Sequence, residues 1–120
     1  MIEAQLSENL SKESIPITFL ALMDSTVVGT VSLDRSDLPS HDHLSPWLAS
    51  LFVLPEMRGR GIATAMVKHA LSFAALQSVS SLYLWTPGST RLYERCGWVE
   101  IERTSYGSRP ITVMQSKATA

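Results

Sequence analysis

The sequence has little of several features that mark particular classes of protein. It contains a single cysteine, Cys96, so no disulfide can form within the chain, and a reducing compartment is expected. No apolar run approaches the about 20 residues that a membrane helix needs. Residues 1–16 have neither the basic region nor the apolar region of a signal peptide. We therefore expect a cytoplasmic protein with no membrane partner.

Charge of one sign is also missing. The chain has 10 Lys and Arg against 11 Asp and Glu, which gives a formal net charge of -1. Without a basic field there is little to gather nucleic acid, so nucleic acid is not an expected partner. Hydrophobic residues make up 45% of the 120 residues. That content suffices for a core, and the length predicts one domain over residues 1–120.

Hydrophobic periodicity predicts a mixture of strands and helices. Strands are expected at residues 17–23, 26–33, 47–54, 81–85, 98–104 and 111–115, and helices at 3–12, 62–77 and about 90–96. Asp24-Ser25 predicts a tight hairpin between the first two strands. Gly97 can supply the left-handed residue that ends the last helix. The order predicts an α/β (α+β) fold, a mixed and mostly antiparallel sheet flanked by helices.

Three segments carry more detailed expectations. Residues 47–54 form a nearly continuous apolar run, as in a central strand covered on both faces. Residues 98–104 alternate as a half-exposed strand does. Residues 34–46 form a long polar loop with two prolines, and its His41, Asp42 and His43 are expected to be solvated. The three tryptophans, Trp47, Trp85 and Trp98, are expected to pack in the core.

The stretch "LPEMRGRGIATAMV" joins an apolar strand to an amphipathic helix through a basic, glycine-rich turn. Glycines allow close approach to a ligand, and the first turn of a helix attracts anions. The pattern is neither a Walker A loop nor G-x-G-x-x-G, because Thr64 stands where the third glycine would be. It predicts a phosphate or pyrophosphate cradle, with an ordinary basic strand-to-helix turn as the alternative.

Two stretches resemble the GNAT family of N-acetyltransferases. "LFVLPEMRGRGIATAMV" resembles motif A, whose pattern Q/R-x-x-G-x-G/A is filled by Arg58, Gly61 and Ala63. "LYLWTPGSTRLYERCGW" resembles motif B, which ends in L-Y-x-x-x-G-[FW] at Leu92-Tyr93 to Gly97-Trp98. The resemblance covers about residues 16–116 and implies the acyl-CoA N-acyltransferase fold. Usual members begin with a further strand and a helix pair, so the resemblance implies a short member that lacks the first strand and helix.

The resemblance implies acetyl-CoA as cosubstrate and assigns residues to it. The strand residues Leu51, Phe52 and Val53 would hold the pantetheine arm. The pyrophosphate would lie on the turn and first helical residues, Arg58, Gly59, Arg60, Gly61, Ile62, Ala63 and Thr64. Ser89, a candidate helix cap, and Tyr93 complete the cofactor site. Tyr93 would also be the catalytic acid that protonates the leaving thiolate, with simple packing of its helix as the alternative.

Other roles at the site stay open. Where some members carry a basic Glu, this chain has Trp47, so His41, Asp42, His43 or water alone are the candidate bases. The chemistry needs no metal, and no metal is expected. Arg103, Tyr106 and Arg109 would contact a carboxylate or phosphate of the acceptor, or else form a solvated hairpin tip.

The leading prediction is an acetyl-CoA-dependent N-acetyltransferase acting on a primary amine of a small molecule or peptide in a ternary complex. The alternatives are a catalytically weak CoA-binding sensor or interaction module, and a domain that binds phosphate but not CoA. If the N-terminal wall of the acceptor site is missing, either a homodimer partner completes it or the site is unusually open.

Overall fold

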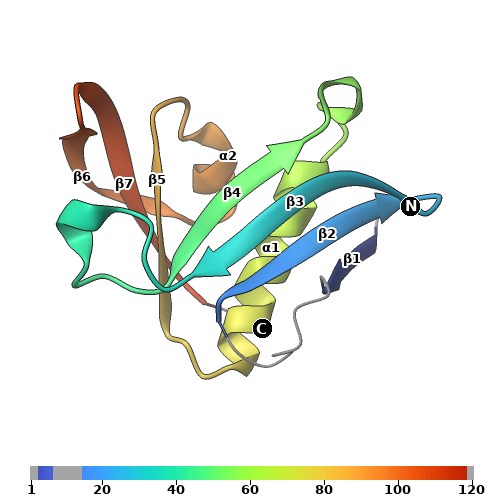
Figure 1. Ribbon diagram of the computed structural model, residues 1–120, viewed down its shortest axis with the longest axis horizontal. Coiled ribbons are helices and arrows are strands. Elements are labelled where there is room, and N and C mark those ends of the chain that lie inside the picture. The colour runs from blue at the N-terminus through green and yellow to red at the C-terminus, as the bar shows by residue number, and fades with distance from the viewer. Residues whose placement is uncertain (1–2, 7–14, 119–120) are drawn as a thin grey trace.

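A computed structural model describes residues 3–6 and 15–118, which form one seven-stranded sheet in the order β1-β2-β3-β4-β5-β7-β6. The strands are β1 (Glu3–Leu6), β2 (Ile17–Met23), β3 (Thr26–Asp34), β4 (Trp47–Val53), β5 (Ser81–Thr86), β6 (Val99–Tyr106) and β7 (Arg109–Lys117). The helices are α1 (Ile62–Leu76) and α2 (Arg91–Arg95), with short 3-10 turns at Pro39–His41 and Pro55–Met57. All strand pairs are antiparallel except β4 with β5, and α1 packs across one face of the sheet (Figure 1). The predicted fold class is confirmed.

The start of the chain corrects the sequence prediction. Residues 3–6 form β1 rather than part of a helix, and β1 pairs antiparallel with β2 from Glu3↔Leu22 to Leu6↔Phe19. A strand therefore stands where the first strand was expected to be missing. As a strand, residues 3–6 form backbone hydrogen bonds with the edge of β2. A short helix with no packing partner is only marginally stable in water. The rest of that prediction, residues 7–12, lies outside the described residues.

The predicted hairpin between β2 and β3 is confirmed. Met23 faces Thr26, which leaves Asp24 and Ser25 as a two-residue turn. Both have positive φ, 50° and 66°. Two consecutive residues of this kind match the right-handed twist of the flanking strands, which is why such turns favour Asp, Asn and Gly.

The main core lies between the sheet and α1. Ile62, Met66 and Ala70 of the predicted helical stripe are at most 1% exposed, and Phe73 packs partly buried beside them. A Cβ on Gly29 of β3 would come within 2.9 Å of the Phe52 carbonyl oxygen. Glycine at this position therefore lets β3, β4 and α1 pack closely, and the helix is fixed firmly against the strand that precedes it.

A smaller core lies on the opposite face of the sheet, under the 34–46 loop. Leu38 from the loop is 1% exposed and packs with Trp47, Ile111 and Val113. The Trp47 indole also donates a hydrogen bond to the Leu44 carbonyl oxygen at 2.7 Å. Burial of about one leucine side chain stabilises by roughly 1.5–3 kcal/mol. The loop is therefore anchored to the sheet.

The centre of the sheet opens between β4 and β5. These strands share one residue pair, Trp47↔Tyr83, and then diverge (Figure 1). A bulge in β4, with φ of 55° at Ser50, shifts its register against β3 between Thr30 and Ser32. Bulges bend a strand and increase its twist. The 47–54 run is consequently buried only at its start and at Val53, while Ser50 and Phe52 are exposed, which corrects the prediction of a strand covered on both faces.

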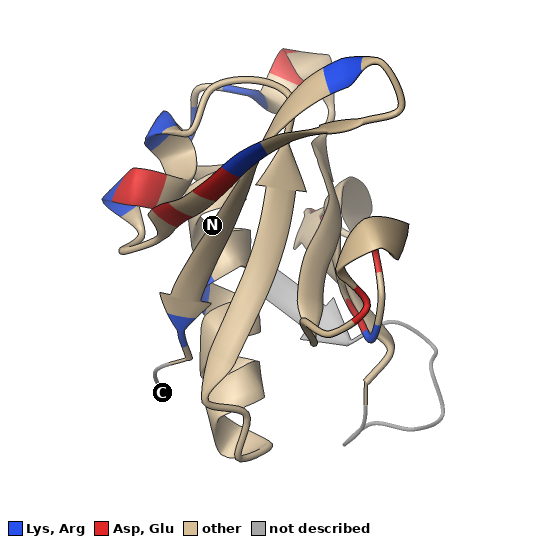
Figure 2. Cartoon of the chain, turned by 90° about the vertical axis from the view of Figure 1, so that its left-hand side faces the viewer, with Lys and Arg blue, Asp and Glu red and all other residues tan. Residues whose placement is uncertain are grey.

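The edge strand β6 is more exposed than its alternation predicts. Val99 and Ile101 are 59% and 43% exposed, and polar neighbours on the strand are exposed as well. Glu100 forms an ion pair with Arg103 at 2.9 Å on the same strand. Acidic and basic residues are interspersed over the visible side of the molecule (Figure 2). Charge on an edge strand discourages edge-to-edge pairing with other chains.

Candidate active site

The glycine-rich turn lies at the open end of the β4–β5 gap and lines a pocket of about 380 Å³, here called the turn pocket. The lining residues are Val53, Met57, Arg58, Gly59, Gly61, Ile62, Ala63, Thr64, Leu92 and Arg95. Most of the predicted pyrophosphate residues are therefore together in one pocket. Met57, Leu92 and Arg95 were not assigned from the sequence. The two α2 residues lie one helical turn apart, a spacing that could have suggested that they share a face.

Backbone geometry gives the turn pocket its character. Gly59 and Gly61 have φ of 78° and 82°, and no atom lies within 4 Å of a Cβ built on either. The left-handed conformation, rather than a lack of space, therefore requires glycine here. Gly61 is the N-cap of the 15-residue helix α1. The first N–H groups of a helix have no partner within it, and the helix dipole makes this end positive. The pocket is suited to an anion.

Arg58 ties the turn to the end of β4. Its Nε donates a hydrogen bond to the Val53 carbonyl oxygen at 2.9 Å, and its guanidinium lies 5.5 Å from the centre of the Phe52 ring. Leu54 N–H donates to the Val28 carbonyl oxygen at 2.9 Å. Since alternate residues of a strand direct their backbone groups to opposite neighbours, Val53 N–H faces the side from which β5 has diverged. It is available to a ligand in the gap.

Five predicted cofactor residues lie outside this lining. Leu51 and Tyr93 line a second pocket, described below, and Phe52, Arg60 and Ser89 line neither. Phe52 is 48% exposed and packs beneath Arg58. Arg60 is exposed and does not line the turn pocket. The Ser89 hydroxyl accepts a hydrogen bond from the Arg91 N–H at 3.2 Å, but the N-cap residue of α2 is Thr90, which makes no capping side-chain hydrogen bond. The cofactor role of Ser89 stays a prediction.

A second pocket of about 290 Å³ lies on the other side of the same gap and is here called the tyrosine pocket. It is lined by Asp37, Leu48, Ala49, Ser50, Leu51, Leu84, Trp85, Thr86, Pro87, Tyr93 and Arg109. Leu51 thus faces this pocket, while Val53, two residues further along β4, faces the turn pocket. β4 connects the two.

Tyr93 enters the tyrosine pocket from α2. Burial raises the pKa of its phenol above the usual 10.0, and nearby Cys96 adds to the shift. Its ring packs edge-on against Trp98 with 6.2 Å between the centroids. A phenol with a raised pKa stays protonated at neutral pH and can donate a proton to a stronger base. Tyr93 therefore has the protonation state that a proton donor needs, and its catalytic role stays a prediction.

Asp37 is the acidic group of the tyrosine pocket, and the sequence analysis did not single it out. Burial raises the pKa of its carboxyl above the usual 3.8, and Asp34 adds to the shift, while a hydrogen bond from Trp85 opposes it. The Trp85 indole also donates to the Asp37 backbone carbonyl oxygen at 3.0 Å. Nothing in the pattern of a polar loop distinguishes this aspartate from Asp34 or Asp42. Its place in the tyrosine pocket follows only from how the 34–46 loop folds back over the sheet.

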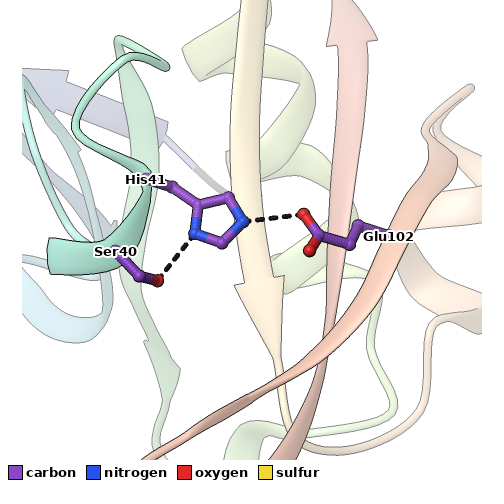
Figure 3. Close-up of polar contacts among 3 residues, drawn as sticks. All are labelled: Ser40, His41 and Glu102. Carbon is purple, nitrogen blue, oxygen red and sulfur yellow. Dashed lines mark hydrogen bonds and ion pairs between the residues drawn. The ribbon is translucent and has the colours of Figure 1, made fainter.

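The candidate bases at residues 41–43 lie elsewhere. His41 is 8% exposed, with Nδ1 2.7 Å from Ser40 Oγ and Nε2 2.7 Å from Glu102 Oε1 (Figure 3). His43 stacks on His41 with 5.7 Å between centroids, and Asp42 accepts a hydrogen bond from Ser36. None of the three lines either pocket. The prediction of a solvated loop is wrong for His41, which instead ties the 34–46 loop to β6.

The hairpin side chains separate as well. Arg109 lines the tyrosine pocket, Arg103 is paired with Glu100, and Tyr106 packs against the edge of Trp85 at 5.3 Å. Trp47 and Trp98 are buried, as predicted, whereas Trp85 is half-buried and forms a pocket wall. Over residues 3–6 and 15–118, no three His, Cys, Asp or Glu residues gather as they would around a metal ion.

Comparison with known proteins identifies the family to which this chain belongs. The chain matches the model of the acetyltransferase (GNAT) family over residues 3–98 and belongs to that family. No curated protein matches the sequence. In the described part of the chain, no helix has both the length and the apolar character to cross a membrane.

Solved structures share the fold at low sequence identity. An IAA acetyltransferase from Bacillus cereus is 16% identical with a TM-score of 0.74, and the match covers 98% of this chain and 99% of that one. A GNAT family acetyltransferase from Elizabethkingia anophelis with acetyl-CoA bound is 12% identical, with a TM-score of 0.74 and 97% of each chain covered. An aminoglycoside 6'-acetyltransferase type Ii is 18% identical, with a TM-score of 0.73, covering 92% of this chain and 72% of that one.

Proposed function

We propose that this protein transfers the acetyl group of acetyl-CoA to a primary amine within a ternary complex. The observation that carries the proposal is the gap between β4 and β5, which has a pocket lined by the glycine-rich turn at one side and a half-buried tyrosine at the other. A long molecule with a pyrophosphate in one part and a reactive thioester in another matches this arrangement. Membership of the acetyltransferase family supports the same reading.

The pyrophosphate of the cosubstrate would lie on the N–H groups at the start of α1. Gly59 and Gly61 keep this backbone open, and Arg95 from α2 adds a positive charge to the lining. Arg58 would act through the backbone of β4, since its Nε is engaged by Val53. The pantetheine arm would follow β4 along Val53 and Leu51. The acetyl-CoA bound to the Elizabethkingia anophelis neighbour supports this cosubstrate.

Acetyl transfer would take place in the gap beside β4, between the Val53 N–H and the tyrosine pocket. The neutral amine forms a bond to the thioester carbonyl carbon, and the negative oxygen that develops there needs an N–H donor, which Val53 can supply. The C–S bond then breaks. Tyr93 gives its proton to the leaving sulfur, and the phenolate recovers a proton from the nitrogen that has become acylated. The products are an amide and free CoA.

The test is release of CoA thiol from acetyl-CoA in the presence of a broad panel of primary amines, together with calorimetry of CoA and of ATP binding. We expect CoA to bind and one class of amine to stimulate thiol release well above the rate without amine. CoA binding with no stimulation by any amine would instead favour the sensor. Tight binding of ATP without binding of CoA would reject the acetyltransferase reading altogether.

A further inference from the structure

The tyrosine pocket contains one acidic and one basic side chain, and they come from distant parts of the chain. Asp37 belongs to the loop before β4, and Arg109 begins β7. All other lining residues are uncharged. Within the described residues, the ion pairs are His41–Glu102 and Arg103–Glu100, so neither charge of the pocket is neutralised by an ion pair. The pocket therefore presents a separate negative and positive end.

The negative end is held in place. Trp85 donates to the Asp37 backbone carbonyl oxygen at 3.0 Å, and the next residue, Leu38, is buried in the smaller core. Asp34, which raises the pKa of Asp37, adds further negative potential at this end. An ammonium group placed here would be attracted by the carboxylates of both Asp34 and Asp37. The backbone of Asp37 is anchored, so its carboxylate oxygens lie in a defined region.

The positive end is Arg109, the first residue of β7. Arg103 and Arg109 are both exposed, but the Arg103 guanidinium is engaged by both carboxylate oxygens of Glu100, at 2.9 and 3.2 Å. A guanidinium free of such a partner offers a planar pair of donors that fits a carboxylate. In the β6–β7 hairpin, Arg103 is therefore paired with Glu100, whereas Arg109 is available to bind a carboxylate of a ligand.

From this juxtaposition we infer that the acceptor is a small zwitterion, an amino acid or close analogue, with its ammonium at Asp37 and its carboxylate at Arg109. The inference rests on the proposed acetyl transfer and specifies its substrate class. A volume of about 290 Å³ with walls from Leu51, Trp85 and Pro87 suits a small molecule rather than an oligosaccharide.

Asp37 has a chemical role in this arrangement. The bound ammonium gives one proton to the Asp37 carboxylate, and the neutral amine then attacks the thioester carbon. Over the whole reaction the ammonium and acetyl-CoA become an amide, free CoA and this one proton, which Asp37 releases to water. The proton that Tyr93 gives to sulfur is replaced from the amide nitrogen, so Tyr93 ends as it began.

The experiment compares matched acceptors by CoA thiol release: each of a set of amino acids, its methyl ester and its decarboxylated amine. We expect kcat/KM for the best amino acid to exceed that of its ester and of its amine by at least about tenfold. Arg109→Ala should remove this preference, while Arg103→Ala, on the same hairpin, should retain it. Arg109→Glu should reverse it toward diamines, a gain that misfolding cannot produce.

Asp37 is tested in the same assay. Asp37→Asn should lower kcat with every acceptor by about 100-fold, the lower end of the usual range for a lost acid or base. Asp42→Asn, in the same loop but outside the pocket, should leave kcat unchanged. An amino acid titrated into the protein saturated with CoA gives an independent readout by calorimetry, and its binding should weaken in Arg109→Ala.

The outcomes separate the inference from the proposed function. Efficient acetylation of the decarboxylated amines, unaffected by Arg109→Ala, would overturn the zwitterion and leave the acetyltransferase intact. Absence of turnover with Arg109-dependent binding of an amino acid would support the zwitterion and reject acetyl transfer. Absence of both amino acid turnover and amino acid binding would overturn the inference.

Discussion

The two pockets along β4 differ in how the chain builds them. The turn pocket comes almost entirely from one continuous stretch, Val53 to Thr64, with two residues added from α2. The tyrosine pocket draws on the 34–46 loop, β4, β5, α2 and the start of β7. One pocket is therefore a local property of the sequence, and the other is a property of the fold.

The two pockets are therefore expected to recognise their ligands in different ways, one through the backbone and the other through side chains. A pyrophosphate can be held by backbone N–H groups, which every sequence has, provided that glycines permit the turn. Recognition of an acceptor depends on side chains such as Asp37 and Arg109, brought together by a loop and a hairpin. Substitutions should therefore divide into those that affect the cosubstrate and those that affect the acceptor.

The largest effect is expected from Gly61→Glu in the turn pocket. The new carboxylate would lie in the pocket, would repel a pyrophosphate, and would force a left-handed φ of 82° on a residue that disfavours it. We expect CoA affinity, measured by calorimetry, to fall more than about 100-fold.

The matched control for this substitution is Gly107→Glu in the β6–β7 hairpin. Gly107 also has a positive φ, 63°, and open space around its Cβ, but it does not line the turn pocket. It should lose similar stability and keep CoA affinity. Equal losses of affinity in the two variants would show that backbone strain, rather than the pocket, is responsible.

The next effect is expected from Tyr93→Phe, which leaves the ring packed on Trp98 and removes only the hydroxyl. Turnover should fall about 100-fold, with little change in CoA affinity. Because burial raises the pKa of Tyr93 above 10.0, the ordinary pKa of a tyrosine, the wild-type rate should not decline on the alkaline side until the pH exceeds 10.0.

The control for this substitution is Tyr83→Phe. Tyr83 is also half-buried but lies outside both pockets. An unchanged rate in Tyr93→Phe would remove this residue from the mechanism.

The same contrast explains what the sequence could predict of the fold. Residues 17–23 match β2 in full, and α1 begins at the predicted residue, because repeated apolar spacing over several turns or alternations is a strong signal. β1 was missed because four residues carry little pattern of their own and depend on the neighbouring strand. The β4 bulge was missed because an apolar run does not show where its register shifts.

The sequence located residues of the turn pocket better than those of the tyrosine pocket. Motif A is filled by Arg58, Gly61 and Ala63, and all three line the turn pocket. Asp37 is one of three aspartates in a polar loop, and its neighbours along the chain do not distinguish it. The fold places it beside Trp85 through contacts between residues 48 positions apart in the sequence. Pairings of this range are not contained in any local pattern.

A smaller effect, confined to the tyrosine pocket, is expected from Glu102→Ala. Glu102 Oε1 lies 2.7 Å from His41 Nε2 and so helps to hold the loop that contains Asp37 (Figure 3). Its loss should reduce the free energy of unfolding by about 1–2 kcal/mol and raise KM for the acceptor several-fold, with CoA affinity unchanged.

Two further variants test whether Glu102 acts through the loop. Glu102→Gln retains a hydrogen-bonding group and should restore most of the acceptor KM. Glu100→Ala, which breaks the exposed pair with Arg103, should change neither KM nor stability by much. A loss of CoA affinity in Glu102→Ala would mean that the two pockets are less independent than their construction indicates.

The smallest effect is expected at the bulge that separates the pockets. Ser50 has φ of 55° and Ser78, after α1, has φ of 63°, so glycine should relieve backbone strain at both. Each substitution should stabilise the protein by no more than about 1 kcal/mol, since the relief is partly offset by the greater flexibility of unfolded glycine.

The two variants should differ in their kinetics. Ser78 lies outside both pockets, so Ser78→Gly should leave the kinetics unchanged. Ser50 lies in the tyrosine pocket, where Ser50→Gly removes a hydroxyl and loosens the bend of β4. A change in acceptor KM at Ser50→Gly alone would show that the bulge sets the acceptor geometry. Identical kinetics in both variants would show that the strain at Ser50 does not set the acceptor geometry.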